Sequence, residues 1–297
     1  MMILSFKRII LILLFIFFNY RSPIFAQDST GYKFEFLPPG LHFQSIKANY
    51  QEPKIGVLYF PSNANLKLDV GNSIDLLAFR LPADQLYFTF GIDFFAYALS
   101  TSFSGNRLQI DALDGLFGGN ATISKEYSNN RLVIRFRILH NSAHLVDGHY
   151  NQNTDTWINN QKPIPYTKDF GELLGAYEMN SDFILLRYYS GLSYATLVRP
   201  STLKRWNFLA GIESILPYIV GRVFNNRANI FASYHFLING ENKYSGNSDF
   251  MFGIKFGSWY KKGITFYAEF YSGQKRFNEY FRERIQEFGT GFYIDFF

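Results

Sequence analysis

From residue 54 onward, apolar and polar residues alternate with a period of two along much of the chain. In the stretch 86–94, every second residue is large and apolar, and the residues between include Thr, Gly and Asp. This alternation predicts β-strands with one apolar face, because successive side chains of a strand point to opposite sides of the sheet. The pattern recurs at residues 132–138, 230–238, 250–257, 264–271 and 288–296.

Turn sequences such as Asn129-Asn130 and Lys261-Lys262-Gly263 separate these stretches. The spacing predicts about twelve strands, an even number as in single-chain bacterial membrane barrels. Longer polar connections are expected at 148–169, 239–249 and 272–283. Short turns at one rim and long loops at the other are typical of membrane barrels.

The composition decides which all-β architecture to expect. Aromatic residues make up 20% of the chain, with 34 Phe and 21 Tyr, and the predicted apolar faces are dense in Phe. The mean hydropathy of −0.08 is too low for a helical membrane protein. It suits a barrel, in which only alternate residues meet lipid. A soluble β-sandwich would also alternate, but it would bury its apolar faces in one core. We therefore predict an all-β fold, an antiparallel transmembrane β-barrel.

The N-terminus has the features of an export signal. Lys7 and Arg8 precede an apolar run at 9–18, and Ala26 ends a plausible cleavage site. The alternative, a membrane anchor, requires a longer apolar run. We expect a signal peptide at 1–26, an extended periplasmic leader at 27–52 and the barrel at 53–297. The predicted location is the outer membrane of a Gram-negative-type bacterium.

Charge and motifs exclude several kinds of chemistry. The chain has no Cys, so disulfides and thiolate sites are impossible. Its net charge of +5 is spread over scattered Lys and Arg, and no nucleic-acid partner is expected. No metal motif, phosphate loop or dinucleotide fingerprint appears, so we expect neither a cofactor nor a metal. The expected partners are outer-membrane lipids and the barrel-insertion machinery, since the last strand ends on the aromatic Phe297.

The predicted strand 132–145 contains the candidate chemistry. Beyond Ile138, the apolar face continues into His140, Ser142 and His144, just before the longest loop. Side chains two apart on a strand lie roughly 6.5–7 Å from each other at Cα. A serine hydroxyl and an imidazole can then meet, as activation of a serine nucleophile requires. The site would face lipid rather than the lumen.

The sequence leaves open which other residues would complete such a site. Asp147, Asn153 and Asp155 could orient the histidine, and backbone amides or Asn141 could stabilise an oxyanion. The competing interpretation is that these polar residues only mark the membrane interface or anchor the loop. Inward charges are expected to pair in a filled lumen, or else to line a pore. The remaining histidines of the leader and the later strands, His42 and His235, are interpreted as structural.

Two segments resemble one bacterial family, which is identified only as a domain of unknown function and is predicted to form outer-membrane barrels. Residues 116–149, LFGGNATISKEYSNNRLVIRFRILHNSAHLVDGH, resemble its central hairpin with a His-x-Ser-x-His-Leu-x-Asp pattern. Ala143 stands where Ser is frequent, and Val146 where Gly is frequent. Residues 268–296 resemble its closing hairpin. The resemblance implies a fold and no activity.

The His140-x-Ser142 pair is also similar to the catalytic pair of outer-membrane phospholipase A and of the lipid A deacylase barrels. That similarity implies an outer-leaflet acyl hydrolase with Ser142 as nucleophile and His140 as base, although His144 has equal spacing. Two hypotheses therefore remain. One is an outer-membrane barrel with a structural, transport or binding role, and the other is a serine-type lipid acyl-ester hydrolase.

Overall fold

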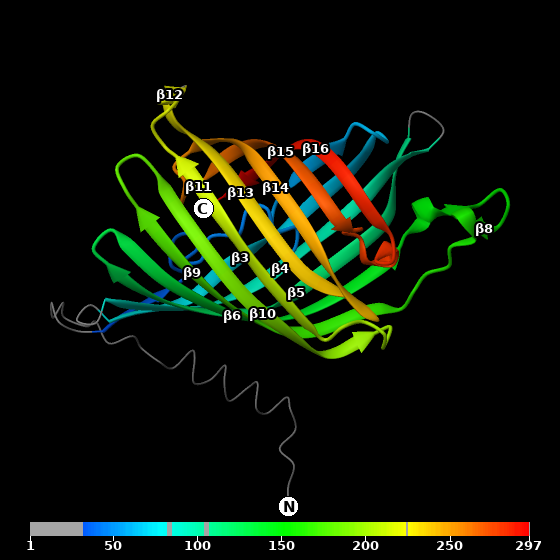
Figure 1. Cartoon of the computed structure of the whole chain (residues 1–297), viewed down its shortest axis with the longest axis horizontal. Coiled ribbons are helices and arrows are strands. Elements are labelled where there is room, and N and C mark those ends of the chain that lie inside the picture. Colours follow the sequence, from blue (N-terminus) through cyan, green and yellow to red (C-terminus); the bar gives the residue numbers. More distant parts are fainter. Residues whose placement is uncertain (1–31, 82–84, 104–106, 224, 297) are drawn as a thin grey trace, which may run out of the picture. The chain divides into compact units, whose positions relative to one another are not determined.

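A computed structural model describes residues 32–81, 85–103, 107–223 and 225–296. Twelve antiparallel strands pair side by side into a closed ring, which confirms the predicted all-β barrel and its strand number (Figure 1). The strands of the ring are β2 (Gly56–Phe60), β3 (Asn65–Leu81), β4 (Leu86–Phe103), β5 (Arg107–Tyr127), β6 (Asn130–Leu145), β9 (Tyr166–Asn180), β10 (Leu185–Arg199), β11 (Trp206–Leu216), β13 (Asn226–Glu241), β14 (Lys243–Gly257), β15 (Gly263–Gln274) and β16 (Arg284–Asp295).

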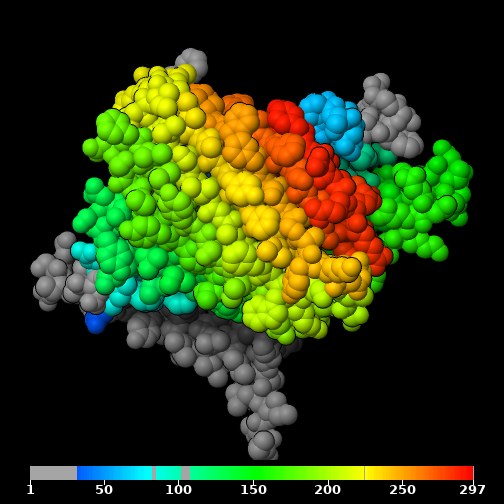
Figure 2. All heavy atoms as spheres, viewed as in Figure 1, coloured from blue at the N-terminus to red at the C-terminus, as the bar shows by residue number. Residues whose placement is uncertain are grey.

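The ring closes where the last strand meets the first. β16 pairs with β2 over four residues, from Thr290 opposite Tyr59 to Tyr293 opposite Gly56. Figure 2 shows β16, in red, beside the light blue β2–β3 segment on the surface. A short strand, β1 (Lys33–Phe36), pairs with the far end of β3. Pairing around the whole ring leaves no free edge along most of the sheet, as a membrane-spanning sheet requires.

The connections define two rims. The loop rim holds the connections 146–165 and 275–283, and the terminal rim is the one at which β16 ends. The 146–165 connection contains β7 (Tyr150–Asn151) and β8 (Thr156–Trp157) and extends away from the ring (Figure 1). The predicted loop at 239–249 is wrong, because β13 and β14 continue to a turn at Asn242 alone. Asn242 has φ +52°, a left-handed conformation that Asn tolerates in tight turns.

The outer wall is apolar, as the alternation predicts. Phe94 is 69% exposed and Ile138 is 60% exposed, although both are large hydrophobic residues. The last strand follows the same register, with Phe288, Phe292 and Ile294 on the outside. The apolar face of the strands therefore points away from the lumen, as in a lipid-facing wall. The predicted signal peptide at 1–26 and the terminal Phe297 lie outside the described residues.

The leader fills the interior of the barrel. After β1, the chain at 37–55 enters the lumen, where Phe43, Ile46 and Tyr50 are buried among inward side chains of the strands. The ring of Tyr50 packs edge-on against Tyr97 of β4, with the centroids 5.9 Å apart. The backbone N–H of Lys47 donates to Glu213 of β11 at 2.6 Å. The leader is thus a packed part of the barrel core.

Inward charges pair inside this filled lumen, which confirms the paired interpretation. Glu52 of the leader accepts two hydrogen bonds from Arg135 of β6, at 2.6 and 2.9 Å. Glu172 of β9 accepts from Arg137 at 2.7 Å. Burial alone would raise the pKa of Glu52, but the charges of Arg135 and Arg137 outweigh burial and lower it to about 2. In the described part of the chain, no helix is long and apolar enough to cross a bilayer.

Candidate functional site

The three predicted site residues of β6 lie on the outer wall. Their neighbours Leu139, Asn141 and Ala143 point inward and are buried, so the even-numbered residues of β6 point out. His140 and Ser142 are half-buried on that wall, and His144 is exposed. All three follow Ile138 toward the loop rim. The period of two therefore places the cluster outside the barrel and close to the 146–165 connection.

A carboxylate of the neighbouring strand holds His140. The Nδ1 atom of His140 lies 2.5 Å from an Oδ atom of Asp169 on β9. The two side chains remain 35% and 42% exposed on the outer wall. A carboxylate at this nitrogen favours the tautomer with the proton on Nδ1, which leaves Nε2 free to accept a proton. An imidazole fixed in this way has the arrangement of a general base.

Strand pairing positions the histidine from both sides. In the register of β6 with β9, His140 is directly opposite Asp169. In the register of β6 with β5, it is opposite Phe117, whose ring centroid lies 4.9 Å from that of the imidazole. Facing pairs of this kind are the closest side-chain neighbours in a sheet. The backbone of three adjacent strands therefore sets the place of the imidazole.

Ser142 lies two residues from His140 on the same face. In the part of the chain that the structure describes, its hydroxyl makes no hydrogen bond with either His140 or His144. Opposite Ser142 is Thr167 of β9, whose hydroxyl donates to the carbonyl of Asn141 at 3.2 Å. The serine and the imidazole are thus neighbours on one wall without being bonded. Catalytic hydrogen bonds are often longer in unliganded proteins than in substrate complexes.

The proposed third members do not meet the histidine. Asp147 is exposed in a short 3₁₀ turn, η2 (Asp147–His149), and Asp155 accepts a hydrogen bond from Tyr150. Asn153 lies in the same loop, and within the described ranges none of the three is hydrogen-bonded to His140. Asp169 occupies that place instead. A signal for it exists in the sequence, since Asp169 shares the parity of the outward Leu173, Tyr177 and Met179 of β9.

The suggestion that Asn141 stabilises an oxyanion is wrong. Asn141 is 1% exposed and points into the barrel, on the opposite side of β6 from Ser142. Neither polar atom of its amide has a hydrogen-bond partner among the described residues. Adjacent residues of a strand face opposite sides of the sheet, so an odd-numbered residue of β6 cannot reach a carbonyl at Ser142.

An apolar hollow adjoins the His140–Asp169 pair on the outer wall. Its sides are the rings of Phe90, Phe117 and Phe136, and it extends to Ile138 and His140. Gly119 contributes no side chain, so the wall is recessed there. A Cβ added at this glycine would meet only the carbonyl oxygen of Gly91 at 3.7 Å. The hollow therefore has apolar walls and one polar end, at His140 and Asp169.

A serine–histidine contact that the sequence did not indicate lies inside the barrel. The Nε2 atom of His42 in the leader is 2.5 Å from the hydroxyl of Ser124 on β5. Its ring packs on Tyr87 with the centroids 4.1 Å apart. His235, also interpreted as structural, lies 3.0 Å from the hydroxyl of Tyr189 in the lumen. These histidines join strands and leader to one another.

Together, a closed ring of twelve strands, an apolar outer wall and a polar filled lumen define an outer-membrane-type β-barrel. The chain belongs to the family described as "Protein of unknown function (DUF1207)", which matches residues 113–296. No curated protein matches the chain.

Two solved structures are similar to the barrel. One is the beta domain of the Bordetella autotransporter BrkA, with 11% identity, 81% of this chain and 96% of that chain covered, and a TM-score of 0.40. The other is a bacterial polysaccharide outer membrane secretin, with 8% identity, 82% and 99% covered, and a TM-score of 0.33.

Proposed function

We propose that this protein spans the outer membrane of a Gram-negative-type bacterium, with the loop rim outside the cell. The apolar outer wall and the long 146–165 connection support this orientation. Its partners are then outer-membrane lipids and the barrel-insertion machinery. Protease added to intact cells should cut within 146–165. Cleavage of intact cells at 217–225, on the terminal rim, would instead reverse the orientation.

Within that membrane, we propose that the protein is a serine-type lipid acyl hydrolase acting on the outer leaflet. The main supporting observation is the pair of His140 and Asp169 on the lipid-facing wall, with the outward Ser142 two residues along β6 from His140. Polar groups that face lipid are costly and are usually retained for a function. Their place near the loop rim corresponds to the height of the ester bonds of outer-leaflet lipids.

In the proposed mechanism, each residue has one role. Ser142 attacks the carbonyl carbon of an acyl ester, and Nε2 of His140 takes the serine proton. Asp169 holds Nδ1–H and stabilises the imidazolium that forms. Collapse of the tetrahedral intermediate breaks the ester bond, and the leaving alcohol receives the proton from His140. Water then attacks the acyl-enzyme while the same imidazole takes its proton. Breaking the bond between the acyl group and Ser142 releases the fatty acid, and His140 returns the proton to the Ser142 oxygen.

The apolar hollow supports a lipid as the substrate class. An acyl chain lying between Phe117 and Phe136 would have its carbonyl end near His140. Contact with aromatic and aliphatic side chains favours a long chain over a short one by the area removed from water. Phospholipids and acylated lipid A both offer such chains, and the site chemistry is the same for either.

A second candidate is a barrel with a structural, transport or binding role and no hydrolysis. The observation that favours it is the Ser142 hydroxyl, which is not bonded to His140 in the described structure. The filled lumen makes an open pore the least suitable of these roles, because the leader and its ion pairs occupy the interior.

Fatty-acid release distinguishes the two candidates. Purified full-length protein is mixed with phospholipid or lipopolysaccharide in detergent micelles. We expect wild type to release fatty acid and Ser142→Ala to release none above background. Ser190→Ala is the matched control, since Ser190 is an outward, exposed serine of β10. Equal release by wild type and Ser142→Ala would reject the hydrolase.

A further inference from the structure

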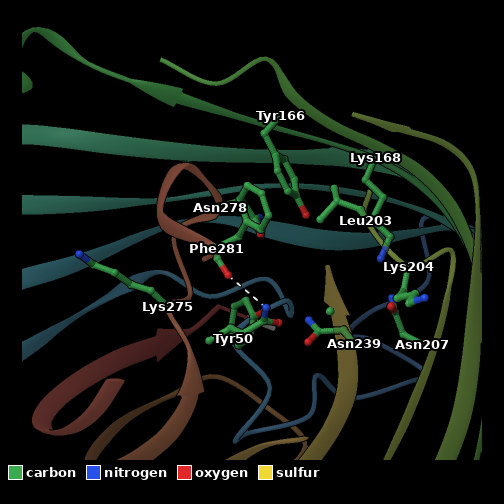
Figure 3. A pocket seen from close by; sticks show the side chains of 12 residues that line it. Tyr50, Tyr166, Lys168, Leu203, Lys204, Asn207, Asn239, Lys275, Asn278 and Phe281 are labelled. Carbon is green, nitrogen blue, oxygen red and sulfur yellow. Dashed lines mark hydrogen bonds between the residues drawn. The ribbon is translucent and has the colours of Figure 1, made fainter. Parts of the chain in front are cut away.

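A small cavity at the loop rim, on the inner side of the wall, has chemistry that the proposed hydrolysis does not use. It lies between the leader, β9, the β10–β11 connection, β13 and the β15–β16 connection (Figure 3). Lys168, Lys204 and Lys275 line it, together with Tyr50 and Tyr166. No Asp or Glu is among the described residues that line it. The charged side chains of the lining are therefore all positive, and the nearby carboxylate of Asp114 lies behind Asn278, which donates to it.

Two of the three lysines lack a carboxylate partner. Lys275 is paired with Glu283 at 3.1 Å. In the described ranges of the chain, neither Lys168 nor Lys204 has a carboxylate within 4 Å. The ammonium group of Lys168 contacts the amide oxygen of Asn207 at 2.5 Å, in the amide orientation that satisfies the neighbours of Asn207. A partly enclosed ammonium has three donors, and this contact leaves two of them available.

Two phenols add neutral donors to the same space. Tyr50 and Tyr166 are each only 8% exposed, and both line the cavity. Among the described residues, neither hydroxyl has a hydrogen-bond partner. Burial raises the pKa of Tyr50 above its usual range, so this phenol keeps its proton. Figure 3 shows the side chains of Tyr166 and Lys168 directed toward the centre of the cavity.

The side-chain amides that line the cavity already make hydrogen bonds to the protein, but one NH₂ group among them is left as a donor. The side-chain oxygen of Asn239 already accepts a hydrogen bond from Asn247 at 2.8 Å, so its NH₂ group stays available. Gln274 donates to the carbonyl of Phe281 at 3.1 Å, and Asn278 donates to Asp114 at 2.6 Å. The ammonium group of Lys204 lies over the ring of the exposed Tyr244, 5.5 Å from its centroid. The groups left for a ligand are therefore the ammonium group of Lys168, two phenols and one amide NH₂.

We propose that this cavity binds a small oxyanion, namely a phosphate group, through Lys168, Tyr50, Tyr166 and Asn239. Positive charge together with unbonded donors matches a ligand that has negative charge and only acceptor oxygens. A neutral sugar would need acceptors as well as donors. The phosphate can come from free inorganic phosphate or from a phosphorylated lipid headgroup at the loop rim. The site is independent of Ser142 and of any hydrolysis.

Calorimetric titration of the full-length barrel in nonionic detergent tests this site, with inorganic phosphate as the probe. We expect saturable binding at one site per chain. Lys168→Met should weaken binding at least tenfold, and Tyr166→Phe severalfold, because each removes a donor without changing the wall. Lys243→Met is the matched control, since Lys243 is exposed at the same rim but does not line the cavity, and it should bind like wild type.

Absence of saturable binding by wild type overturns the proposal. So does equal affinity in wild type and Lys168→Met, provided that heat-modifiable gel migration shows both barrels to be folded. If Lys168→Met does not fold, Tyr166→Phe still tests the site, because this variant keeps the aromatic ring and removes only the hydroxyl. A second titration uses mixed micelles of phosphate-bearing or dephosphorylated lipid A. Competition with inorganic phosphate only by the phosphate-bearing lipid identifies a headgroup as the source, whereas no competition by either identifies the free anion.

Discussion

This barrel brings histidine and serine side chains together on both sides of its wall. In the lumen, Nε2 of His42 lies 2.5 Å from the Ser124 hydroxyl, and Arg131 donates to the carbonyl of His42 at 2.6 Å. Burial and the charges of Arg131 and Arg80 lower the pKa of His42 to about 3. An imidazole with so low a pKa is a poor acceptor for the proton of a serine.

The outer-wall arrangement differs in its geometry. Ser142 is not bonded to His140 there, but Asp169 holds the imidazole and an apolar hollow adjoins it. The contrast teaches that a short serine–histidine distance does not by itself make a nucleophile. What matters is a carboxylate on the far nitrogen, an imidazole basic enough to accept a proton, and access for substrate.

Removing each serine should give the largest difference between the two regions. Ser142→Ala should lower the rate of fatty-acid release by about 10³-fold or more, since it deletes the nucleophile. Ser124→Ala should leave that rate unchanged and lower the free energy of unfolding by about 1 kcal/mol, the worth of one hydrogen bond. Initial rates and urea unfolding in lipid vesicles measure both. Loss of activity on changing Ser124 alone would reverse the assignment.

The orienting carboxylate should have the next largest effect. Asp169→Asn should lower kcat by about 10²–10⁴-fold with little change in KM, because the imidazole loses its fixed tautomer. Asp147→Asn, a loop carboxylate that does not meet His140, serves as the control and should keep wild-type rates. A change in KM alone would show that Asp169 only shapes the lipid surface.

A substitution in the lumen should change the stability of the barrel rather than the rate of fatty-acid release. Glu52→Gln leaves two buried arginines with less countercharge and should lower the free energy of unfolding by about 3–5 kcal/mol. The folded-state pKa of Glu52, about 2, is below its ordinary value of 4.5. Its contribution is therefore complete above about pH 4.5 and is lost as the pH falls toward 2. Urea unfolding across this range should show that loss in wild type and not in Glu52→Gln.

Filling the hollow should have the smallest effect. Gly119→Leu should raise KM for long-chain lipid esters by about tenfold and leave a short soluble ester unaffected, because the chain and not the reacting carbonyl is displaced. Gly175→Leu is the control, because Gly175 is on the outer wall of β9 and an added Cβ there meets no described atom within 4 Å. An equal loss on short and long esters would place the acyl chain elsewhere.

Local patterns in the sequence were sufficient to predict the outer wall of the barrel. The period of two correctly predicts that Ile138, His140 and Ser142 share the outer face, because the direction of a side chain on a strand depends only on the neighbouring backbone. The closing strand β16 could be predicted for the same reason. The Asn239-Gly240 turn signal misled, since Gly240 adopts φ +155° within β13 and the chain turns at Asn242.

Contacts between segments that are distant in the sequence could not be predicted from such patterns. Asp169 meets His140 only because β6 and β9 pair in one register across the 146–165 connection, and a connection of that length does not fix a register. Glu52 lies in a leader whose place is set by Arg135 and other strand residues far away in the sequence. For the same reason, the sequence showed no partner for His42.

Covalent labelling tests the account most directly. The wild-type barrel in detergent is treated with a fluorophosphonate, which reacts with activated serines, and the modified residue is identified by peptide mass spectrometry. We predict labelling of Ser142 that is lost in Asp169→Asn and His140→Ala, with Ser124 unlabelled. An unlabelled Ser142, or labelling that does not depend on His140, would contradict a catalytic site on the outer wall.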